Sequence, residues 1–195
     1  KLIYVGAHAF STCKNPNSTV SIGAVPSLER IEYNAFHTFG GNLQITSGGM
    51  QALSYIGRYS FYNCNHPDSF VDFGDAPSLG RIEVHAFQYM EGTVHIDAMV
   101  SLSYIDDCAF QFFQGTLHIA AGPMPKLTFI DYKAFYDNPN PNSTITLGAM
   151  PALEIIKRSV FSKFSGRLNI TAGDVPQLIE LAPECFRYAD NPSSE

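Results

Sequence analysis

Two histidines and one aspartate are the residues of this sequence whose types and placement could support metal chemistry. Asp72, His95 and His118 each stand between the two apolar residues of a short alternating segment, so they should share one outward face. A carboxylate and two imidazoles on neighbouring elements could hold zinc with an open coordination position. The alternative is the hydrated polar face of a sheet, which needs no ligand. We favour that alternative and predict no metal site and no cofactor.

Nucleophilic catalysis has no candidate residues. The sequence shows neither a Ser-His-Asp nor a Cys-His set with a third, orienting group. None of its four cysteines lies in a C-x-x-C motif, which excludes a zinc ribbon or a redox pair of that kind. We therefore predict that the chain is not an enzyme.

A second set of side chains is suited to binding. The position before a recurrent isoleucine carries Tyr4, Arg30, Tyr55, Arg81, Tyr104, Phe129, Ile155 and Glu180. Arginines stacked between tyrosine rings would form cation–π contacts, and both residue types are enriched at binding hot spots. The alternative is a ladder that covers the core and recognises nothing.

These residues recur because the chain is a repeat of the motif P-x-L-x-x-I-x-x-x-A-F. Eight phenylalanines mark coils 1 to 8, at intervals of 23 to 26 residues: Phe10, Phe36, Phe61, Phe87, Phe110, Phe135, Phe161 and Phe186. Such a period indicates a solenoid, in which each coil buries its apolar side against its neighbours. We expect the rings to stack in the core beside the small residue before each one, and x-x-x-A-F to form a bend or a single 3₁₀ turn.

Between the motifs lies a pair of apolar residues at a spacing of two. This alternation predicts one short strand per coil, seven in all, stacked in parallel at about 4.8 Å. The outward residues of these strands form a row: Ser21, Gln44, Asp72, His95, His118, Thr146 and Asn169. In this alignment His118 stands between His95 and Thr146.

Two classes of turn lead into the strands. Long turns rich in Asn, Pro and Ser follow Phe10, Phe61 and Phe135, because these residues fix the backbone or bond back to it. Short turns carry a glycine, for which a positive φ is expected. These glycines are Gly41, Gly92, Gly115 and Gly166.

Three N-x-S/T sequons are candidate glycosylation sites if the chain passes through a eukaryotic secretory route. Asn17 and Asn142 lie in long polar turns, where a glycan would fit, and Asn169 lies within a predicted strand.

The four cysteines are predicted to be unpaired core residues. Cys13 and Cys64 occupy the same column two coils apart, so about 10 Å should separate them, beyond the limit of about 7 Å between bridged Cα atoms. Cys108 and Cys185 are three coils apart and cannot meet either.

The segments Val5–Cys13 and Ile56–Cys64 match the pattern I-G-x-x-A-F-x-x-C. This pattern resembles leucine-rich repeats, most closely those of the BspA-like class, and the resemblance extends over the whole chain. It implies a β-rich leucine-rich-repeat solenoid of about eight coils. It also implies an extracellular or cell-surface protein that binds host proteins or other cells.

Composition narrows the class of partner. A formal net charge of −6 and a pI near 5.4 argue against a nucleic-acid or anionic-membrane surface, which would need clustered Lys and Arg. No apolar run approaches the roughly 18 residues that a membrane span requires. A protein or cell-surface ligand remains.

We expect residues 1–195 to form one solenoid domain of a longer protein, because Lys1 opens inside a coil and Asp190–Ser194 resembles the start of another long turn. The predicted function is non-enzymatic protein binding or adhesion. The contact should centre on the sheet face near the short coil 4, at Asp72, His95, His118 and Thr146. The strip Tyr55, Arg81, Tyr104 and Phe129 is the second candidate.

The rival prediction is a structural spacer with no specific ligand. The terminal coils would expose an apolar layer and unpaired strand edges, which also predicts end-to-end self-association.

Overall fold

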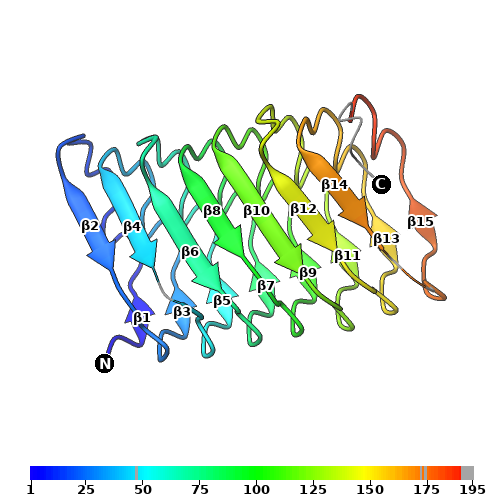
Figure 1. Cartoon of the computed structure of the whole chain (residues 1–195), viewed down its shortest axis with the longest axis horizontal. Coiled ribbons are helices and arrows are strands. Elements are labelled where there is room, and N and C mark those ends of the chain that lie inside the picture. The colour runs from blue at the N-terminus through cyan, green and yellow to red at the C-terminus, as the bar shows by residue number, and fades with distance from the viewer. Residues whose placement is uncertain (47, 172, 174, 190–195) are drawn as a thin grey trace.

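The chain winds into a stack of coils that carries two parallel β-sheets along its length (Figure 1). The computed structural model describes residues 1–46, 48–171, 173 and 175–189. The predicted long turn at Asp190–Ser194 lies outside the described residues. Within those that are described, no helix has the length and hydrophobicity of a membrane span.

The alternating segments form a seven-stranded sheet, as predicted. Its strands lie in chain order along the solenoid, one per coil, and the outer side of this sheet is called the sheet face (Figure 1). The strands are β2 (Thr19–Ile22), β4 (Asn42–Thr46), β6 (Phe70–Gly74), β8 (Thr93–Ile96), β10 (Thr116–Ala121), β12 (Thr144–Leu147) and β14 (Arg167–Ile170).

A second sheet was not predicted. Each L-x-x-I segment contributes a two-residue strand, and eight of these strands pair in parallel. Two residues are too few to show an alternating pattern, so the sequence indicated only one strand per coil. We call the outer side of this sheet the ladder face. Its strands are β1 (Tyr4–Val5), β3 (Arg30–Ile31), β5 (Tyr55–Ile56), β7 (Arg81–Ile82), β9 (Tyr104–Ile105), β11 (Phe129–Ile130), β13 (Ile155–Ile156) and β15 (Glu180–Leu181).

The x-x-x-A-F segments form a third side, built from overlapping turns. In coil 2 the amides of Asn34, Phe36 and Thr38 donate to carbonyl groups of coil 3 at 3.0, 2.7 and 2.8 Å. Asn34 and Thr38 have φ values of 55° and 52°, and the residues two before and two after every motif phenylalanine share this left-handed conformation. That conformation costs about 1–2 kcal/mol per residue, so bonds between coils must hold it in place.

The phenylalanine spine is confirmed. Successive motif rings stack nearly parallel, with centroids 4.8–5.5 Å apart from Phe10 to Phe186. The six inner rings are fully buried, and the alanine beside most of them leaves room for this spacing. Other rings pack against this stack edge-on. The centroid of the Phe73 ring, for example, lies 6.0 Å from that of Phe61 and 6.2 Å from that of Phe87.

The register of the seven-stranded sheet shifts by two residues at two places, which corrects the predicted alignment. Ile119 lies opposite Ile145, although the apolar pairs had aligned Leu117 with that residue. At this step Ser143 is buried at the end of a long turn, and its hydroxyl accepts a hydrogen bond of 3.0 Å from the Leu117 amide. The long turn places this serine where a core residue was predicted.

The same shift occurs between β4 and β6, where Ile45 lies opposite Val71. There the Ser69 hydroxyl accepts a hydrogen bond of 3.1 Å from the Leu43 amide. Because the same arrangement recurs after two long turns, we attribute the shift to the turn chemistry.

Two smaller expectations also need correction. Of the four short-turn glycines, only Gly92 has a positive φ. Gly115 is required for another reason, because a Cβ there would clash with the Gly92 carbonyl oxygen. Four free cysteines are confirmed, but Cys13 is exposed because no coil covers it, whereas Cys64, Cys108 and Cys185 are buried.

Candidate functional site

The side chains of the predicted histidine row already have partners within the chain. His95 lies between two carboxylates, with Nδ1 3.2 Å from Asp72 Oδ1 and Nε2 3.0 Å from Asp97 Oδ1. The rings of His95 and His118 meet edge-on, with their centroids 6.4 Å apart. Burial lowers the pKa of His118, and the nearby His95 lowers it further. No group of three or more His, Cys, Asp or Glu side chains among the described residues is arranged to hold a metal ion.

The register shift separates Thr146 from this row. The neighbour of His118 is Thr144, whose hydroxyl lies 2.9 Å from Nδ1, and Thr146 lies opposite Ala120. Asp72 likewise lies opposite Thr46 and not Gln44. The row predicted at the centre of the contact therefore consists of Asp72, His95 and His118 only.

The ladder face has the predicted register, and its polar groups bind one another. The Arg30 guanidinium lies 4.2 Å from the centre of the Tyr55 ring, and Arg81 lies 5.2 Å from that of Tyr104. Phe129 stacks on Tyr104 at 4.8 Å. Arg81 also donates two hydrogen bonds, of 2.6 and 2.9 Å, to the buried carboxylate of Asp106. These contacts favour a self-contained ladder.

The third side, which we call the turn face, carries an aromatic surface that was not predicted. It is the outward side of the turn segments around the motif phenylalanines. Seven of the ten tyrosines are on it: Tyr33, Tyr59, Tyr62, Tyr89, Tyr132, Tyr136 and Tyr188. The most exposed are Tyr33 (41%), Tyr89 (38%), Tyr132 (40%) and Tyr188 (56%).

Three of these tyrosines join His37 and Phe112 in a continuous aromatic ribbon across coils 2 to 6. Its successive members are His37, Tyr62, Tyr89, Phe112 and Tyr136, with centroids 5.1, 5.7, 5.1 and 5.7 Å apart. Contacts alternate between stacked and edge-on, the arrangements that aromatic pairs prefer. Burial lowers the pKa of His37, so its imidazole is neutral near pH 7 and contributes an uncharged ring.

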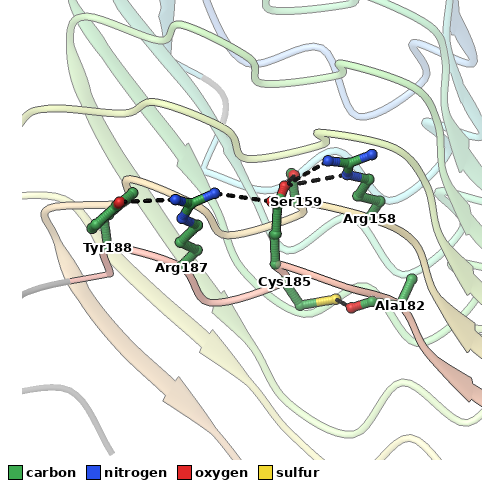
Figure 2. Close-up of polar contacts among 7 residues, drawn as sticks. Arg158, Ser159, Ala182, Cys185, Arg187 and Tyr188 are labelled. Carbon is green, nitrogen blue, oxygen red and sulfur yellow. Dashed lines mark hydrogen bonds and ion pairs between the residues drawn. The ribbon is translucent and has the colours of Figure 1, made fainter.

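At the coil 6 end of the ribbon, where Tyr136 lines it, a groove of about 260 Å³ lies on the turn face at coil 7. Its floor contains Ser159 and Ser162, both buried, and larger side chains of coils 6 and 8 form its walls. Figure 2 shows Arg158 and Arg187 on opposite sides of Ser159. Both arginines bind the carboxylate of Glu184, at 3.0 and 2.9 Å.

The two turn classes produce hollows at the rim of the coils. Where short turns are recessed between long ones, spaces of about 550 and 390 Å³ open beside His66 and beside Asn140. The sequon residues Asn17 and Asn142 are exposed on long turns. Asn169 lies in β14, where its side chain accepts a hydrogen bond of 3.3 Å from the Thr171 hydroxyl.

A family model for the BspA type leucine rich repeat region matches six copies, over residues 1–113 and 55–192. The chain belongs to the BspA-type leucine-rich repeats. No curated protein and no solved structure matches it. BspA-type repeats are commonly protein-binding or adhesion repeats, are typically found on surface or secreted proteins, and are generally not enzymes.

Proposed function

We propose that this BspA-type repeat is a non-enzymatic, extracellular or cell-surface module that binds a protein through its turn face. The observation that carries the proposal is the aromatic ribbon, in which Tyr89 is exposed, together with the exposed Tyr33, Tyr132 and Tyr188 on the same face. Tyr is among the residue types most enriched at hot spots. Exposed aromatic side chains gathered on one side of a soluble molecule mark an interaction surface.

The ribbon is also ordered before any partner arrives. Tyr89 contacts both Tyr62 and Phe112, so neighbouring rings restrict its rotamers. Because immobilising a side chain costs about 0.5–1.5 kcal/mol on association, a pre-ordered surface binds more tightly for the same contact area.

The other two sides offer less. Polar residues dominate the sheet face, and its histidine row is already paired with Asp72, Asp97 and Thr144. On the ladder face, Arg30 and Arg81 already form ion pairs with carboxylates of the same chain. A partner would have to displace these contacts before making its own.

The test compares faces in a single assay. A panel of purified extracellular proteins is screened by biolayer interferometry, and hits are measured again with two double variants. Tyr89→Asn with Phe112→Asn alters the turn face, using the residue that coil 3 carries at the same position, Asn63. His95→Ala with His118→Ala alters the sheet face.

The turn-face variant should weaken binding at least tenfold, which corresponds to about 1.4 kcal/mol. The sheet-face variant should change affinity less than twofold. Loss of binding in the sheet-face variant alone would return the contact to the sheet. A panel without any saturable binder would favour a structural spacer.

A further inference from the structure

We propose that the groove at coil 7 binds an acidic segment of a protein partner, in extended conformation and through its carboxylates. This inference rests on the proposed function, because the segment would belong to the partner of the turn face.

The groove exists because coil 7 has small side chains where its neighbours have large ones. Ser159 occupies the position held by Lys133 in coil 6 and Glu184 in coil 8. Ser162 likewise lies between Tyr136 and the arginine of coil 8. Coils 6 and 8 are two coil spacings apart, about 10 Å, which is the width of an extended peptide with its side chains.

The groove brings several basic residues of an acidic protein together. Four of the twelve Lys and Arg residues line it: Lys133, Arg158, Lys163 and Arg187. Among the residues that the structure describes, Glu184 and Asp137 are the carboxylates that form ion pairs with them. These described groups therefore have a formal surplus of two positive charges, in a chain of net charge −6.

The surplus can be assigned to particular groups. Glu184 neutralises only one of the two arginines that bind it, and those arginines together with Ser159 lower the pKa of its carboxyl. Lys133 has no carboxylate partner among the ion pairs of the described residues. Its ammonium lies 4.9 Å from the centre of the Tyr132 ring and 4.8 Å from that of Tyr136. An incoming carboxylate would meet cations that are already held in place.

The ligand chemistry follows from these groups. Clustered arginines recognise acidic peptide motifs, and the tyrosine walls supply apolar contact between the charges. A nucleic acid is disfavoured because it would require many more phosphate contacts than a surplus of two charges supports. Opposite charge across the contact should also accelerate association, and added salt should weaken it.

The experiment measures fluorescence anisotropy of a labelled decapeptide of alternating glutamate and serine, with a glutamine–serine decapeptide as the control probe. Lys133→Gln removes one groove cation. Arg30→Gln removes one cation from the ladder face and is the matched control for charge. Ser162→Tyr fills the groove with the residue that coils 3 and 6 carry at that position, Tyr62 and Tyr136, so the fold should be retained. Circular dichroism checks folding of each variant.

The glutamate probe should bind at least tenfold tighter than the glutamine probe at 50 mM salt. Lys133→Gln and Ser162→Tyr should each weaken it at least fivefold, and Arg30→Gln less than twofold. Equal losses for Lys133→Gln and Arg30→Gln, or unchanged binding in folded Ser162→Tyr, would overturn the proposal. So would the absence of saturable binding at 1 mM probe, or a sulfated oligosaccharide that binds tenfold tighter than the peptide.

Failure here is distinguishable from failure of the proposed function. Tyr89 and Phe112 lie outside the groove lining, and the peptide assay needs no identified partner. If the groove variants bind normally while the turn-face variant still loses its partner, only the acidic-segment inference is wrong.

Discussion

Replacing Phe87 by alanine tests the spine on which every face depends. The Phe87 ring is fully buried and stacks on Phe61 and on Phe110, at 4.8 Å on both sides. Its backbone is fixed as well, because the Phe87 amide donates a hydrogen bond of 2.7 Å to the Ala109 carbonyl. The neighbouring coils therefore have little freedom to close over the missing ring.

The magnitude follows from this rigidity. Phe→Ala substitutions in cores cost about 3–5 kcal/mol, and the loss is greatest where the surroundings do not collapse. Stacked aromatic pairs contribute about 0.5–1.5 kcal/mol beyond their buried area, and Phe87 loses two such contacts. We therefore expect the free energy of unfolding to fall by about 4–5 kcal/mol.

The matched control is Phe186→Ala in the last described coil. Its ring stacks on a single motif phenylalanine, Phe161, at 5.5 Å, and it is 42% exposed, so we expect a loss below about 1.5 kcal/mol. Urea denaturation followed by circular dichroism gives both values, provided that the m-value is unchanged. A Phe87→Ala protein within about 1 kcal/mol of wild type would refute the stacked core.

Two further predictions concern the thiols and the ends of the coil stack. Cys64, Cys108 and Cys185 are buried, and burial raises the pKa of each of these thiols. Only the exposed Cys13 should therefore react with Ellman's reagent within minutes in the native protein. Rapid native labelling in a Cys13→Ser variant would contradict that expectation. Ile179 is 78% and Leu181 56% exposed on the last coil, so the 195-residue chain should self-associate in sedimentation experiments as its concentration rises. Changing both residues to serine should abolish this association, and a wild-type monomer at every concentration would refute it.

Much of the fold could be predicted because the repeated motif identifies the residues of the core. The motif leucines, isoleucines and phenylalanines recur in fixed columns, and each column is one layer of the interior. Alternation at Val94 and Ile96, for example, predicts both a strand and its buried side, and β8 has that pattern. Residues in the same column of the repeat contact each other in neighbouring coils, so the periodicity alone predicts these contacts. In an ordinary globular sequence, contacts between distant segments leave no such pattern.

The register and the binding surface could not be read in this way. Ser69 and Ser143 are polar turn residues in the sequence, and their polarity favours an exposed position, although both are buried. The tyrosines of the turn face fall at four different positions around the motif phenylalanine, so they form no column. They come together because the left-handed residues two before and two after the phenylalanine fold each segment into consecutive turns. A tyrosine count restricted to the turn segments would have been the available signal.

Site-specific photo-cross-linking tests the central claim most directly. Benzoylphenylalanine is introduced at Tyr89 on the turn face, His95 on the sheet face or Tyr104 on the ladder face, three ring positions close together in the chain. With a partner identified from the panel, the turn-face position should give the cross-linked complex, and the other two should give little. A complex obtained from position 95 or 104 but not from position 89 would contradict binding through the turn face.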